Sequence, residues 1–181
     1  MDSWRRQLKF DPLRPLLTSD NLALQYMTRR DLLGEQVGPV LGLWELPTVQ
    51  RILKRQLADG SWARLGEQKH LAINYNLIET WRQSRFLVEQ YGLNREHPQV
   101  RKAAEYLFSC QTPQGDIRGM LANQYATYYT GVIMALLEEA GYADDPRIDR
   151  GFRWLLAMRQ DDGAGRSRSS PASWTAPRST G

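Results

Sequence analysis

The sequence has few of the residues that bind metals, form disulfides or cross membranes. It contains one cysteine, Cys110, and two histidines in 181 residues, which excludes an intramolecular disulfide and gives no metal-ligand spacing. The longest purely apolar run, Val132 to Leu137, is far shorter than the roughly 20 residues that span a membrane. No apolar segment of the secretory type follows Met1. We therefore expect a cytoplasmic protein without a metal, another cofactor or a transmembrane segment.

Positive charge is concentrated near the C-terminus. The formal net charge is +4, but residues 164–181 hold three arginines and no acid, which leaves only +1 for residues 1–163. No single segment combines a basic stripe with interleaved aromatic residues, as a nucleic-acid-binding surface would. The apolar content of 41% is typical of a globular protein. We therefore expect no nucleic-acid partner.

The hydrophobic pattern is helical along most of the chain. Proline and glycine separate segments in which apolar residues recur every three or four positions, and almost no alternating strand pattern is present. Two long helices are predicted at about 69–91 and 122–140, with shorter amphipathic helices before, between and after them. The sequence thus predicts an all-α fold in which short and long helices alternate.

The same pattern predicts one domain and a tail. Residues 1–163 are expected to form a single domain, with N-terminal helices in 1–45 and repeated helices in 46–163. Residues 164–181 contain no Leu, Ile or Val and are rich in Ser, Arg and Pro. Such a composition does not bury enough apolar surface to offset the entropy of ordering, so we predict a disordered tail.

A glutamine followed by a glycine turn ends each of three short helices, which indicates an internal repeat. The motif residues are Gln56, Asp59, Gly60 and Trp62 in the first copy, Gln111 and Gly115 in the second, and Gln160 and Gly163 in the third. The glutamines are 55 and 49 residues apart, which is enough for two helices. A large aliphatic residue stands four positions before each glutamine, at Ile52, Leu107 and Leu156.

The first copy, Gln-x-x-Asp-Gly-Ser-Trp, resembles the QW repeat of squalene and hopene cyclases, and protein prenyltransferase β chains share a related pattern. The resemblance implies an α/α toroid of paired helices, with 69–91 and 122–140 as inner helices. It also implies that each glutamine bonds backbone groups at a neighbouring helix end and that the tryptophan stacks over it. The tryptophan position changes along the chain, from Trp62 to Ile117 to Gly165.

Three motifs are fewer than the five or six helix pairs that close a toroid in that family. The resemblance therefore implies an arc rather than a closed barrel, unless another polypeptide completes it. Because the composition changes where the third motif should end, we hypothesise that the sequence is truncated or out of frame after about Gly163. Sequencing the encoding DNA beyond that codon, in all three frames, tests this hypothesis.

The acids that start catalysis in the cyclases do not occur here. A class II cyclase protonates its substrate with an Asp-x-Asp-Asp motif, which this sequence lacks. The nearest pairs are Asp144-Asp145, which we interpret as a helix cap, and Asp161-Asp162, which we interpret as turn residues. The Asp-rich magnesium sites of class I enzymes are also missing. The chain is therefore expected to be incomplete or catalytically incompetent.

The zinc ligands of the prenyltransferases are not found either. Those enzymes use an aspartate, a cysteine and a histidine, but Cys110 has no Asp-x-Cys pattern nearby. We expect Cys110 to be a small, buried apolar residue. His70 and His97 stand at predicted helix starts.

Aromatic residues near or on the two long helices are the candidates for a ligand cavity: Tyr75, Trp81, Tyr125, Tyr128 and Tyr129. On an inner surface, their rings would suit an isoprenoid and could stabilise a carbocation. Ordinary helix packing is the alternative explanation. Two functions therefore stay open, an isoprenoid-handling protein and a non-enzymatic helical-repeat module that binds another polypeptide. A non-functional remnant of a longer gene is a third possibility.

Overall fold

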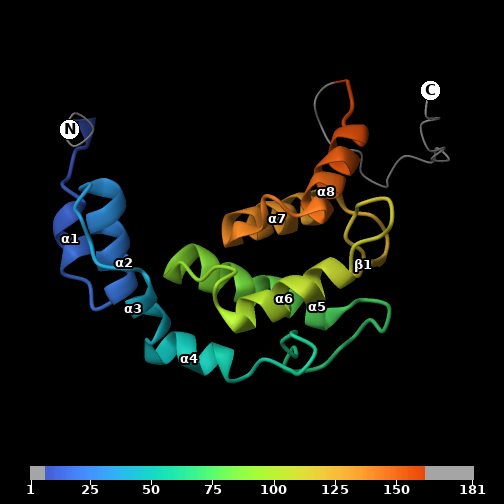
Figure 1. The fold of residues 1–181 in the computed structure, drawn as a ribbon, viewed down its shortest axis with the longest axis horizontal. Coiled ribbons are helices and arrows are strands. Elements are labelled where there is room, and N and C mark those ends of the chain that lie inside the picture. The colour runs from blue at the N-terminus through green and yellow to red at the C-terminus, as the bar shows by residue number, and fades with distance from the viewer. Residues whose placement is uncertain (1–6, 162–181) are drawn as a thin grey trace.

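The computed structural model of the protein describes residues 7–161, and this part of the chain is helical (Figure 1). The predicted tail at 164–181, Gly163 and Gly165 lie outside the described residues. The elements are α1 (Leu13–Leu17), α2 (Leu22–Met27), η2 (Thr28–Leu32), α3 (Leu41–Trp44), α4 (Pro47–Leu53), α5 (Tyr75–Arg85), η3 (Phe86–Gln90), α6 (Pro98–Ser109), β1 (Met120–Asn123), α7 (Thr127–Leu137), η4 (Glu138–Tyr142) and α8 (Pro146–Ala157). The all-α prediction is confirmed, with β1 as a short extended segment.

Proline sets the start of α4, α6 and α8. Each of these helices has proline in its first turn, where the missing amide costs no hydrogen bond. The preceding residue caps two of them, because His97 accepts from the backbone N–H of Gln99 and Asp145 accepts from that of Arg147. His97 thus starts a helix as predicted. His70 does not, because it lies in the loop before α5.

The first long helix starts later than predicted. Residues 69–74 are not helical, and α5 begins at Tyr75. Asn74 is the cap, since its side chain accepts from the backbone N–H of Leu77 at 3.0 Å. The backbone N–H of Asn74 donates to the carbonyl of Gly119 at 2.9 Å, so a turn far along the sequence fixes this start. The far end agrees with the prediction, because η3 continues to Gln90.

The second long helix also starts later than predicted. The segment from Met120 to Asn123 is the strand β1, and α7 begins only at Thr127. The backbone N–H of Gly119 donates to the carbonyl of Ala122, and Ala122 has a positive φ of 53°. This tight turn is incompatible with helix at 122. The helical segment ends near Gly141, whose φ of 98° favours glycine.

The core runs from Ala23, Leu43 and Val49 through the buried residues of α5, α6 and α7 to Ile148 of α8. In Figure 1, α5, α6 and α7 lie in the middle of the molecule, while α1 and α2 lie at one end. The apolar residues Ile133, Leu136 and Leu137, which recur at three and four positions along α7, are buried. Each fully buried aliphatic side chain of this kind stabilises the fold by about 1.5–3 kcal/mol. Among the described residues no helix is both long and apolar enough to cross a membrane.

Candidate functional site

The glutamines of the first two motifs make the same pair of hydrogen bonds. The side-chain amide of Gln56 donates to the carbonyl of Gly60 at 2.9 Å and to that of Gln99 at 2.8 Å. Gln111 donates to Gly115 at 2.9 Å and to Arg147 at 2.9 Å. Gln99 and Arg147 are each the second residue of the next short helix. Each glutamine therefore joins its own glycine turn to the exposed start of the following helix.

The glycines of these turns allow a close backbone approach. Gly60 has a φ of 89°, and a β-carbon there would lie 2.2 Å from the carbonyl oxygen of Lys102 in α6. Gly115 has a φ of 117°, and its β-carbon would lie 2.4 Å from the carbonyl oxygen of Arg150 in α8. Both positions thus require glycine for two reasons, the left-handed conformation and the contact with the next helix.

The residues after the glycines are buried between helices. Trp62 is 3% exposed and Ile117 is fully buried. The backbone N–H of Trp62 donates to the hydroxyl of Thr80 at 3.0 Å, and that of Ile117 donates to the hydroxyl of Thr130 at 3.1 Å. Sequence reasoning did not find these two threonines. The signal that could have found them is a threonine inside each long helix among residues that are otherwise mostly apolar at the buried positions, since Thr80 and Thr130 are both fully buried.

The polar groups of the first motif serve the turn itself. The carboxylate of Asp59 accepts from the backbone N–H of Ser61 at 3.0 Å and from its hydroxyl at 2.8 Å. The indole N–H of Trp62 donates to the carbonyl of Ile52 at 2.8 Å. The tryptophan is thus anchored to the helix that precedes its own turn.

The third motif has a different register from the one expected. At the ends of α4 and α6, the backbone N–H of Gln56 donates to Leu53 and that of Gln111 donates to Phe108. The residue with the same bond at the end of α8 is Arg159, which donates to Leu156, and not Gln160.

The sequence explains this one-residue error. Gly163 stands three positions after Gln160, whereas the glycine stands four positions after the glutamine in the other two motifs. Aligning the three glutamines therefore shifts the end of α8 by one position. The residue four positions before Arg159 is Leu155, which is half-buried. Leu156, which was expected to continue the buried face, is 68% exposed. Gly163 itself lies outside the described residues.

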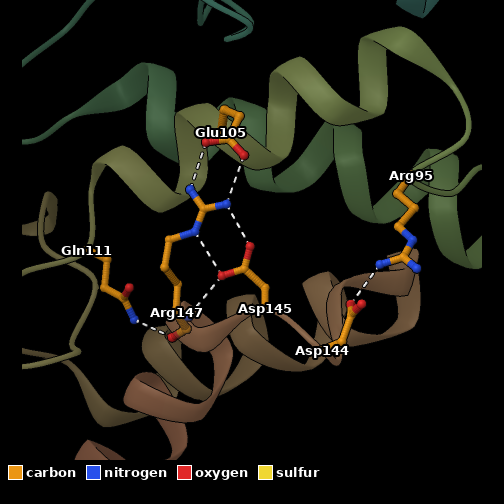
Figure 2. Close-up of polar contacts among 6 residues, drawn as sticks. All are labelled: Arg95, Glu105, Gln111, Asp144, Asp145 and Arg147. Carbon is orange, nitrogen blue, oxygen red and sulfur yellow. Dashed lines mark hydrogen bonds and ion pairs between the residues drawn. The ribbon is translucent and has the colours of Figure 1, made fainter.

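An arginine joins α6 to α8 beside the second motif (Figure 2). The guanidinium of Arg147 donates two bonds to Glu105, at 2.7 and 2.8 Å, and two to Asp145, at 2.9 and 2.7 Å. It also lies 3.8 Å from the ring centroid of Phe108. Its hydrogen bonds lower the pKa of both carboxyls and raise the pKa of the guanidinium. Asp145 is thus a helix cap, as predicted, and it is also an ion-pair partner of Arg147.

Three of the five candidate aromatic residues meet. Trp81 of α5 and Tyr129 of α7 form an edge contact with ring centroids 6.1 Å apart, and Tyr128 lies 5.3 Å from Tyr129. Tyr128 is 67% exposed. The guanidinium of Arg85 lies 5.3 Å from the centroid of Trp81. Trp81, Tyr128 and Tyr129 are called the aromatic cluster below, and the cluster marks where the two long helices meet.

The other two candidates lie elsewhere, so the five residues do not line one cavity as expected. Tyr75 is buried beside Arg64, and its hydroxyl accepts from the backbone N–H of His70 at 3.2 Å. Tyr125 makes an edge contact with Trp154 of α8 at 6.2 Å. Tyr125 and Trp154 line a pocket of about 260 Å³, together with Gln114, Asp116, Arg118 and Met158.

Cys110 is packed at the edge of the core. Its side chain is half-buried, and burial raises the pKa of the thiol. The amide nitrogen of Asn74 lies 3.9 Å from its sulfur. A neutral thiol in this setting is a packing group rather than a nucleophile. Within residues 7–161 no three His, Cys, Asp or Glu side chains gather as metal ligands would.

Comparisons of the chain with protein-family models, with curated proteins and with solved structures gave no match. The geometry of the glutamine motifs and of the aromatic cluster is therefore the basis for a functional proposal.

Proposed function

We propose that the described part of the chain is an arc of an α/α toroid of the cyclase and prenyltransferase type, and that this arc binds an isoprenoid chain. In this proposal α5 and α7 are inner helices, while α4, α6 and α8 are outer helices. The support for the arc is that Gln56 and Gln111 make the same pair of hydrogen bonds, one to their own glycine turn and one to the first turn of the next outer helix. A module that is joined to its neighbour in this way extends by repetition.

The aromatic cluster is the observation that supports the ligand. It lies where the two proposed inner helices meet, and the ring of Tyr128 is largely open to solvent. Aromatic faces and edges offer large apolar contact areas, which suit the methyl groups and double bonds of an isoprenoid. The sequence lacks an Asp-x-Asp-Asp acid, so we propose binding without cyclisation.

Equilibrium binding of tritiated geranylgeraniol to the full chain tests this proposal. We expect saturable binding, and we expect Tyr128→Ala to weaken it roughly 2- to 12-fold because one aromatic contact is worth about 0.5–1.5 kcal/mol. Phe10→Ala is the matched control, since Phe10 is a similarly exposed ring, 77% open, in the N-terminal region. It should leave the affinity unchanged. Absence of saturable binding by the wild-type chain would refute the ligand and favour the protein-binding alternative.

A further inference from the structure

A large apolar residue near the end of each outer helix is buried in α4 and α6 but exposed in α8. Each stands three positions before the motif position of its helix, and these residues are Leu53, Phe108 and Leu156. Leu53 and Phe108 are each 4% exposed, whereas Leu156 is 68% exposed. Phe108 is covered by Tyr142, with ring centroids 5.9 Å apart, and by Arg147 of α8. Within residues 7–161 no further helix covers Leu156 in this way.

The exposed face of α8 has a self-complementary pattern. Asp149, Phe152 and Leu156 stand at i, i+3 and i+7 of α8, which places them on one face. Arg159 follows two residues after the helix ends, at the position of Gln111, whose side chain reaches towards the next short helix. Asp149, Leu156 and Arg159 are exposed, and Phe152 is half-buried. The stripe therefore has a negative end, an apolar centre and a positive end. We call these four residues the α8 stripe.

A two-fold axis near Trp154 would match this stripe with itself. Two antiparallel copies of α8 would place Asp149 against Arg159 and Phe152 against Leu156, once on each side of the axis. Asp149 now pairs with Arg153 on its own helix at 2.7 Å, but both side chains are more than half exposed. Such a surface pair is weak and exchanges readily for an intermolecular one.

We propose that the α8 stripe is a docking surface for the α8 stripe of a second copy of this chain. The chain's own residues 162–181 are a poor occupant, since Trp174 is their only large apolar side chain. The contact uses mainly one helix face of each copy, so the dimer is concentration-dependent.

Sedimentation equilibrium of the full chain, from low to several hundred micromolar, measures this association. We expect a reversible monomer–dimer equilibrium in the wild type and a dissociation constant at least tenfold weaker in Leu156→Glu. Leu71→Glu is the matched control, because Leu71 is a leucine that is 99% exposed outside α8, and it should associate like the wild type. A wild-type chain that stays monomeric throughout, or a dimer that Leu156→Glu leaves intact, overturns the proposal.

Charge reversal tests the antiparallel register. Asp149→Arg and Arg159→Asp should each weaken association, because each places like charges together twice in the dimer. The double variant restores opposite charges and should recover association close to that of the wild type. Circular dichroism of each variant verifies that the helices are retained. Equal weakening in the double variant would overturn the proposed register, and unchanged association in both single variants would overturn the interface.

Discussion

The amide of Gln111, just after α6, lies 2.9 Å from the carbonyl oxygen of Arg147 in the first turn of α8. The same distance separates it from the carbonyl of Gly115, so one side chain joins a helix end, a turn and the next helix. Gln56 has the same role one repeat earlier, towards Gln99 of α6. Stability should therefore depend on these side chains more than on most partly exposed glutamines.

Replacement of Gln111 by alanine should destabilise the fold by about 1–3 kcal/mol, because two backbone carbonyls lose their donor in a partly buried place. Urea unfolding followed by circular dichroism measures the change. Gln114→Ala is the control, since Gln114 is an exposed residue of the same turn and makes no comparable clamp. Equal loss in the two variants would contradict a clamp at Gln111.

Alanine at Gly115 should be more damaging, with a loss of about 3 kcal/mol or more in the free energy of unfolding. The new β-carbon would sit 2.4 Å from the carbonyl oxygen of Arg150, and the φ of 117° strains any other residue. Gly38→Ala provides the comparison, because a β-carbon at Gly38 meets no atom within 4 Å. A Gly115→Ala protein as stable as Gly38→Ala would mean that the turn lies away from α8.

Loss of the hydroxyl of Thr130 should cost about 1–2 kcal/mol, because the buried backbone N–H of Ile117 would lose its acceptor. Thr130→Val keeps the shape of the side chain and removes the acceptor, whereas Thr130→Ser keeps the acceptor. The backbone amide of Ile117 should therefore exchange its hydrogen more slowly in the serine variant than in the valine variant. Similar exchange at Ile117 in both variants would speak against the hydrogen bond.

Stability should fall in acid partly because of Asp145. Arg147 lowers the pKa of this carboxyl below its ordinary value of 3.8, so the folded state binds the proton less tightly than the unfolded state. The contribution is therefore present above that ordinary value and is lost as the pH falls through the folded pKa. Glu105 acts in the same direction but is more exposed, so its share is smaller.

Asp145→Asn tests this pH dependence, because asparagine keeps the helix cap and removes the charge. We expect a loss of about 0.5–1 kcal/mol at neutral pH and a smaller difference from the wild type in acid. Urea midpoints at neutral pH and below the ordinary carboxyl pKa give both values. A difference that is equal at the two pH values would show that the ion pair does not contribute.

Helix type and order could be predicted from the sequence because the signals are local. Proline in the first turn, the caps at His97 and Asp145, and the apolar stripe of α7 are all read within a few residues. The start of α5 could not be predicted, because the turn at Gly119 fixes Asn74 from a distant part of the chain.

The candidate site was predictable only in part for the same reason. Gln56 and Gln111 were identified by their spacing, but their acceptors lie on other helices. A glutamine one position too late, Gln160, hid the equivalence of Arg159 with these glutamines. Tertiary packing also separated the aromatic candidates, since Tyr125 contacts Trp154 while Trp81 contacts Tyr129.

Photo-crosslinking with a diazirine-tagged geranylgeraniol tests most directly whether the aromatic cluster is an isoprenoid-binding surface. After irradiation of the full chain, mass spectrometry of its peptides locates the label, and excess untagged geranylgeraniol identifies the specific fraction. We expect competed label on Trp81 and Tyr128 themselves, located within their peptides by fragmentation. Competed label confined to the pocket of Tyr125 and Trp154, or label that competitor does not reduce, would contradict this expectation.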